Sequence, residues 1–172
     1  ACAGLWQRQK VAHHAVLTVA AAAWLAGSVV WLVQGSAPPA VPFWAAFLIL
    51  TIAGERLELS RFLPTPRAAQ RAFAGIAAAL LLAVGATLFN ETAALRAAGV
   101  VLVVLAAWLA RYDIARRTIR STGLTRYIAA CLLSGYAWLA VAGAMGAAGA
   151  FENGHPLRDA ALHALLLGFV FS

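Results

Sequence analysis

The sequence predicts an all-α, polytopic transmembrane helical bundle with about six transmembrane helices. Of its 172 residues, 63% are hydrophobic and only 11% are charged, and the mean hydropathy is +0.84. So few charged side chains could not cover the surface of a soluble domain of this length. Several apolar runs approach the roughly 20 residues that a helix needs to cross a hydrocarbon core, and the short alternating strands of an outer-membrane barrel are absent.

Six apolar segments account for this bundle, which we expect to be a single domain. Prolines, a polar turn and basic stretches separate the segments, and such residues end or interrupt helices. Trp31 and Trp44 stand on either side of the uncharged loop 34–42, as expected of an interfacial aromatic belt. Small residues at 142–150 predict close helix packing. The expected helices cover residues 11–33, 43–62, 71–89, 93–112, 127–150 and 157–172.

The distribution of lysine and arginine predicts the orientation. If the loops alternate between the two sides of the membrane, eleven basic residues lie on the side of the N-terminus and only Arg96 and Arg158 lie on the other. Cytoplasmic loops carry such an excess, so we expect a multi-pass protein of the bacterial inner membrane with a cytoplasmic N-terminus. Because the charges cluster at the ends of apolar segments, they do not indicate a nucleic-acid partner. The eleven residues are Arg8, Lys10, Arg56, Arg61, Arg67, Arg71, Arg111, Arg116, Arg117, Arg120 and Arg126.

Other signals restrict the function. The sequence contains no phosphate loop, nucleophile elbow, metalloprotease motif or zinc-ligand spacing, which argues against soluble-enzyme chemistry. Its two cysteines are too few for a disulfide framework. The chain starts at Ala1 and its final apolar run has no flanking charge, so we expect a piece of a longer protein.

His163 is the first candidate site residue because it lies within the final apolar run. An ionisable side chain in hydrocarbon is costly unless it faces protein, water, a cofactor or an ion. Asp159, four residues earlier on the same helix face, could accept the ring N–H and leave the other nitrogen to bind haem iron or copper. Gly168 could leave room for the flat macrocycle. The alternative is a histidine that is hydrogen-bonded to a neighbouring helix, and His155 is expected to be a loop histidine.

A charged cluster at the end of the second segment is the next candidate. Glu55, Glu58 and Arg61 are spaced by three residues and can form a ladder along one edge of a helix near the cytoplasmic boundary. Glu55 is the deepest of them and would need a partner. Two interpretations stay open: a structural clamp to a neighbouring helix, and a proton relay or ion path.

The basic stretch after the fourth segment is the third candidate. Asp113 can pair with Arg116 or Arg117 at helical spacing. We expect the remaining charge to bind anionic lipid headgroups of the bilayer, with docking of a soluble partner as the alternative. The arginines concerned are Arg111, Arg116, Arg117 and Arg120.

Two stretches resemble segments of NnrS-like proteins. They are residues 162–172 (LHALLLGFVFS), which contain His163, and residues 54–61 (GERLELSR). NnrS-like proteins are polytopic bacterial membrane proteins that bind haem and copper, are linked to nitric oxide metabolism and are distantly similar to the haem–copper oxidase main subunit. The resemblance implies that His163 is a haem or copper ligand. The rival interpretations are a non-catalytic subunit of a larger respiratory or photosynthetic membrane complex, partnered by other membrane subunits, and a small-solute or proton-coupled carrier that uses Glu55 and Glu58.

Overall fold

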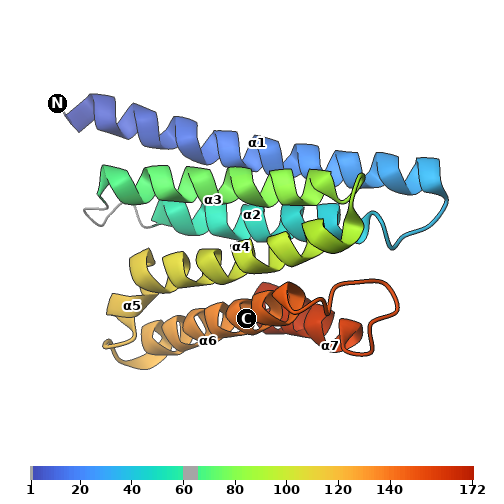
Figure 1. The fold of residues 1–172 in the computed structure, drawn as a ribbon. Helices are drawn as coiled ribbons and strands as arrows, with labels where there is room; N and C mark the ends of the chain where they lie inside the picture. Colours follow the sequence, from blue (N-terminus) through green and yellow to red (C-terminus); the bar gives the residue numbers. More distant parts are fainter. Residues whose placement is uncertain (1, 60–65) are drawn as a thin grey trace.

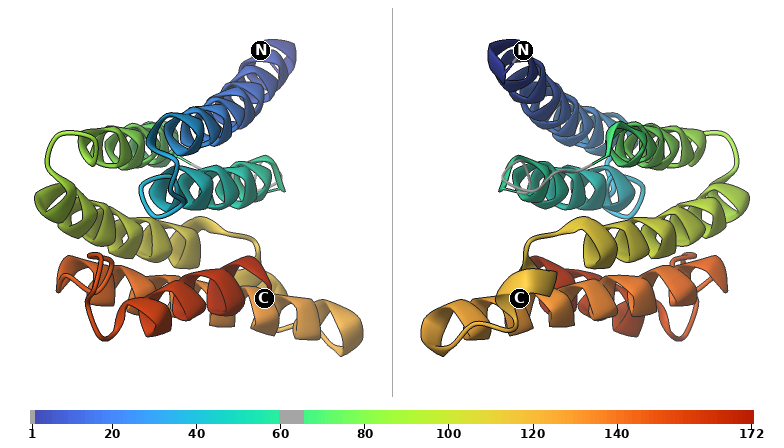
Figure 2. Two further views of the ribbon diagram at one scale, coloured as in Figure 1. Left: turned by 90° about the vertical axis from the view of Figure 1, so that its right-hand side faces the viewer. Right: turned by 90° about the vertical axis from the view of Figure 1, so that its left-hand side faces the viewer.

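The structure, a computed structural model, describes residues 2–59 and 66–172, with side chains in 14–59 and 66–172. Over these residues it is all-helical, and the long helices lie side by side along a common direction (Figures 1 and 2). The elements are α1 (Cys2–Gln34), α2 (Val41–Leu59), α3 (Arg67–Ala86), α4 (Glu91–Tyr112), α5 (Ala115–Thr118), α6 (Gly123–Ala147), α7 (Arg158–His163) and the π-helix η2 (Ala164–Val170).

The all-α class is confirmed, but the predicted number of six helices is wrong. Seven α-helices form within the described ranges. The additional one is α5, a single turn inside the basic stretch that follows the fourth predicted segment. The final segment is also not one α-helix, because the six-residue α7 is followed directly by the seven-residue η2. A π-helix forms i→i+5 hydrogen bonds and is rare in proteins.

Four helices are long and apolar enough to cross a membrane, judged by length and composition over the described residues. They are residues His14–Gln34 of α1 together with α3, α4 and α6. The predicted second span, α2, is not among the four: it is apolar over most of its length but carries three charged residues, Glu55, Arg56 and Glu58, toward its end. These four helices indicate a membrane protein.

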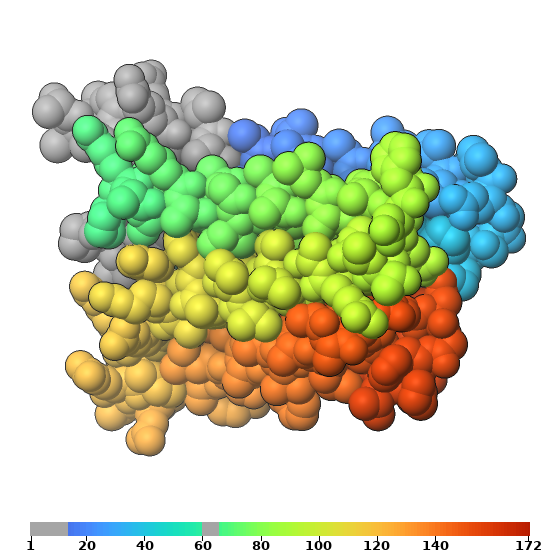
Figure 3. All heavy atoms as spheres, in the orientation of Figure 1, coloured from blue at the N-terminus to red at the C-terminus, as the bar shows by residue number. Residues whose placement is uncertain are grey.

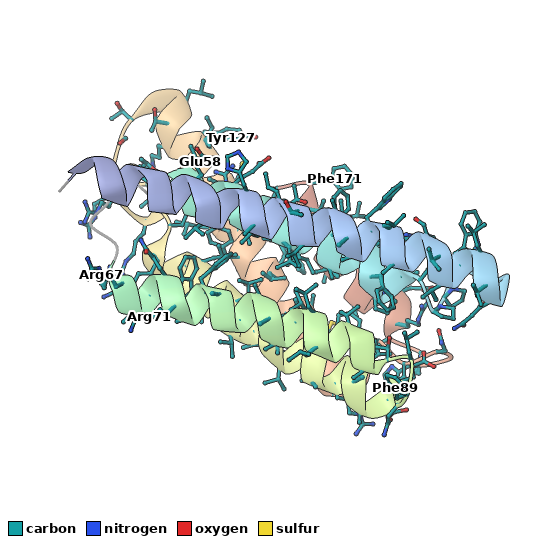
Figure 4. The ribbon with its side chains drawn as sticks, turned by 90° about the horizontal axis from the view of Figure 1, so that it is seen from above. Glu58, Arg67, Arg71, Phe89, Tyr127 and Phe171 are labelled. Carbon is teal, nitrogen blue, oxygen red and sulfur yellow. The ribbon has the colours of Figure 1, made fainter. Side chains whose placement is uncertain are left out.

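Successive connections lie at opposite ends of the bundle. We call the end with residues 35–40, 87–90 and 148–157 the far end, and the end with α5 and the N-terminus the near end (Figure 1). Basic side chains gather at the near end, where Arg67 and Arg71 open α3, whereas Phe89 lies at the far end (Figure 4). The alternation of loops expected from the sequence is therefore present, and the orientation in a membrane stays a prediction.

The closest approach between helices is that of α4 and α6. A Cβ atom at Gly99 would overlap the backbone of Gly146 and Ala147, and one at Gly143 would lie 2.8 Å from the carbonyl oxygen of Gly99. Without side chains at the crossing the two backbones come into direct contact, as the small residues at 142–150 predict. On this face the side chains of α3, α4 and α6 form a continuous surface (Figure 3).

Aromatic side chains attach the other helices. The indole N–H of Trp108 on α4 donates to the carbonyl oxygen of Ala69 on α3 (3.0 Å), and the Trp108 ring lies 4.9 Å from that of Phe73. At the far end, the Trp31 and Trp44 rings meet edge to face at 6.0 Å across the α1–α2 loop, so the two tryptophans do face each other there. A buried indole N–H needs such an acceptor, and Trp108 therefore fixes how α3 sits on α4.

A buried carboxylate connects the near ends of α4 and α6. Asp113 caps α4 and is only 4% exposed. Its Oδ2 accepts from the Tyr136 hydroxyl (2.7 Å) and its Oδ1 accepts from the backbone N–H of Ala115 (2.7 Å). The predicted pairing with Arg116 or Arg117 is wrong, because those side chains are exposed while the Asp113 backbone leaves the helical conformation and turns the carboxylate inward.

The α4–α6 crossing gives the first testable prediction. We expect Gly99→Ala to lower the free energy of unfolding by about 1–3 kcal/mol, because the new methyl group forces two backbones apart. Reversible unfolding in mixed detergent micelles measures this change. Gly75→Ala is the control, since no atom lies within 4 Å of a Cβ there and alanine should stabilise that helix by up to about 1 kcal/mol. Equal effects of the two substitutions would contradict this account of the crossing.

The hydrogen bond between Tyr136 and Asp113 gives the second testable prediction. Tyr136→Phe should cost about 1–3 kcal/mol of unfolding free energy, because it leaves Oδ2 of a buried carboxylate without its donor. The control is Tyr127→Phe on the same helix, whose side chain is exposed and whose removal should change stability by less than about 0.5 kcal/mol. A Tyr136→Phe protein as stable as the Tyr127→Phe protein would show that the contact contributes nothing.

Candidate functional site

His163 is the last residue of α7 and its side chain is exposed. Its Nδ1 lies 2.7 Å from the main-chain carbonyl oxygen of Asp159. A carbonyl oxygen can only accept, so Nδ1 carries the proton of the neutral ring and Nε2 keeps its lone pair. The imidazole is thus oriented by the main chain of Asp159, whereas the sequence led us to expect its carboxylate in this role.

The space beside Gly168 is already filled. A Cβ atom at this glycine would overlap the ring of Trp138 on α6. The expectation that Gly168 leaves room for a macrocycle is therefore wrong, and the glycine instead lets η2 pack closely on α6. The exposed side chains of Leu167 and Phe171 follow His163 along the chain, so the imidazole lies on the outward side of the C-terminal segment and not inside the bundle.

The other histidines do not converge on His163. His155 lies in the far-end loop, as expected, and its Nδ1 accepts from the backbone N–H of Leu157 (3.1 Å). His14 lies on α1, on the opposite side of the bundle, and the side chain of His13 is outside the described part of the chain. Over the described residues no group of three or more His, Cys, Asp or Glu side chains could hold a metal ion. Among the described side chains, His163 is therefore a single candidate imidazole ligand with no second ligand beside it.

The charged cluster at the end of α2 is divided between different environments. Glu55 is exposed, and Glu58 is half-buried toward the near end of the bundle (Figure 4). Arg61, the third member of the expected ladder, lies outside the described residues. Arg56 entered the sequence-based prediction only as one of the basic residues that set the orientation, but its side chain is half-buried and its Nε is buried without a hydrogen-bond partner among the described residues. No local sequence signal marked Arg56, because the burial of Ala53, three residues earlier on the same helix face, is known only from the structure.

The basic residues around α5 are available to an anionic surface. Arg116, Arg117 and Arg120 are exposed at the near end, and the guanidinium of Arg111 lies 5.3 Å from the centroid of the Tyr112 ring. These three arginines therefore lie outside the core, and their binding to lipid headgroups stays a prediction.

A pocket of about 550 Å³, including its open mouth, lies between α2, α3, α4 and the C-terminal segment at the far end. Its walls are apolar apart from Glu91 and Arg158. The sequence did not reveal this pocket, because its wall residues are distributed from Pro38 to Leu165 and share no local pattern.

Comparison with known proteins places the chain in a family. No curated protein and no solved structure matches it. The family described as a domain of unknown function, DUF8744, matches residues 1–172, which is the whole sequence. The chain therefore belongs to the DUF8744 family.

Proposed function

We propose that this chain is part of a multi-pass protein of the bacterial inner membrane in which His163 supplies an imidazole ligand to haem or copper. The resemblance of residues 54–61 and 162–172 to NnrS-like proteins implies this chemistry. The observation that carries the proposal is the exposed Nε2 of His163, whose lone pair is kept free by the hydrogen bond between Nδ1 and Asp159.

The position of His163 supports a ligand role. It lies about 8 Å along the helix from Arg158 at 1.5 Å per residue, so it is level with apolar side chains rather than with the loops. A polar ring that faces hydrocarbon costs free energy unless it gains a partner outside the bundle. The π-helix that follows is a further indication, because such segments occur frequently at functional sites.

One imidazole is sufficient for haem and insufficient for copper. Haem iron takes one or two axial ligands from protein, whereas a copper site needs several side chains. When bound, either group would supply redox chemistry, and this chain would supply the oriented imidazole. Further ligands would come from another chain or from additional sequence packed against the face that carries His163, Leu167 and Phe171.

The rival functions differ in their support. A non-catalytic subunit of a larger membrane complex would use the same exposed face for packing alone and would bind neither haem nor copper. A carrier that uses Glu55 and Glu58 has less support, because the pocket is lined by residues 38–49 at the opposite end of α2 from both glutamates.

Haem and copper content tests the ligand role. The protein purified in detergent from a haem-replete bacterial host should give a Soret band, and His163→Ala should weaken haem affinity at least tenfold, because the axial nitrogen is lost. His155→Ala is the matched control and should leave the spectrum unchanged. Since His163 is exposed, the substitution should change unfolding free energy by less than about 0.5 kcal/mol. Wild-type protein without haem or copper would favour the subunit alternative.

Cysteine labelling tests the orientation. In a protein with Cys2 and Cys131 replaced by serine, Ser36→Cys lies in the far-end loop and Ser121→Cys in the basic near-end stretch, and both positions are exposed. A membrane-impermeant maleimide added to intact cells should label Ser36→Cys and leave Ser121→Cys unlabelled until the cells are opened. The reverse pattern would mean that the excess of basic residues lies outside the cytoplasm, against the expected orientation.

A further inference from the structure

The far-end pocket is elongated along the bundle. On α4 its wall runs from Glu91 at the helix start to Leu102, a distance of about 16 Å at 1.5 Å per residue. Its deepest side chains are apolar, among them Ile49 and Leu165.

Arg158 supplies the positive charge in this lining. Its side chain is half-buried, and Nε is fully buried without a hydrogen-bond partner among the described residues. A buried guanidinium N–H without an acceptor is costly, so such a group usually has a partner of its own. Glu91, the acidic residue of the lining, already accepts a hydrogen bond from the Asn153 amide through Oε1.

The mouth of the pocket is held in place by contacts between the α6–α7 loop and α4. Arg96 on α4 forms an ion pair with Glu152 (2.8 Å), and Asn153 contacts Glu91 at the start of the same helix. Phe151, a wall residue, packs over Gly146, where a Cβ atom would overlap its ring. These contacts fix the residues around the mouth of the pocket.

We propose that this pocket binds a phospholipid of the membrane leaflet at the far end, with one acyl chain in the apolar groove and the phosphate on the Arg158 guanidinium. The pocket has a cationic group at its mouth, at the level of the loops, and apolar walls below it. A phospholipid has the same order of charge and hydrocarbon along its length. Arginine binds phosphate through two parallel N–H donors, which would satisfy the buried Nε.

Native mass spectrometry of the detergent-solubilised full chain tests the proposal, with dioleoyl phosphatidylglycerol as the probe. Arg158→Gln should weaken binding roughly tenfold or more, because it removes a charge-assisted contact in a partly buried site. Arg158→Lys keeps the positive charge but loses the two parallel N–H donors, so it should bind more tightly than Arg158→Gln and less tightly than the wild type. The matched control is Arg126→Gln, which removes an exposed arginine at the near end, away from the pocket, and should change binding by less than about twofold.

Two other probes test separately whether the acyl chains or the phosphate group account for the binding of phosphatidylglycerol. Dioleoylglycerol has the same chains without phosphate and should bind wild-type protein about as weakly as phosphatidylglycerol binds Arg158→Gln. Inorganic phosphate alone should not compete. Equal binding of phosphatidylglycerol to wild type and Arg158→Gln, or full binding of dioleoylglycerol, would overturn the role of Arg158. Competition by inorganic phosphate would identify a site for a soluble anion instead.

A second variant tests the groove independently of the charge. Ala45 is a half-buried wall residue, and Ala45→Phe should fill the groove and abolish binding while Arg158 remains in place. Thermal unfolding of the variant distinguishes a filled pocket from a misfolded protein. A folded Ala45→Phe protein that binds phosphatidylglycerol normally would overturn the placement of the acyl chain.

Discussion

The contact of α4 with α6 through bare backbone is the constraint on which the rest of this structure depends. Gly99 and Gly143 allow an approach that any side chain would prevent. In a bilayer, lipid tails are as apolar as leucine, so helices associate through close packing rather than through the hydrophobic effect. Each partner then carries other elements: α4 holds α3 through Trp108, and α6 holds η2 where Trp138 packs against Gly168.

Polar contacts close the two ends of this helix pair. At the near end Asp113 and Tyr136 form a buried hydrogen bond, and at the far end Arg96 pairs with Glu152 just beyond α6. The long stretch between them is apolar and packed. This distribution suits a membrane, because polar side chains are cheapest where water and headgroups are near and most costly in the hydrocarbon centre. The two contacts also resist sliding of α4 along α6, since a shift of one turn would break both.

The sequence predicted what local composition determines. Apolar runs of membrane length identified the long helices, but the contact of His163 with Asp159 is made by the main-chain carbonyl and not by the predicted carboxylate. The sequence failed where a contact joins distant segments or where a backbone departs from the ordinary helix. Asp113 prefers Tyr136, 23 residues away, to the nearby arginines, and neither α5 nor η2 has a signal of its own within a basic or apolar stretch. The role of Arg158 in the pocket emerged only from tertiary packing.

The far-end pocket also depends on the order of synthesis. Its wall begins at Pro38 and is completed only by Leu165, so every segment from α2 onward must be in place before the cavity exists. Helix pairs that are neighbours in the sequence can pack as they leave the ribosome, because their contacts are local. The cavity cannot form at that stage. A chain without α7 and η2 would lack the wall formed by Arg158, Leu162 and Leu165, so a formed pocket distinguishes molecules in which the C-terminal segment has packed onto the bundle.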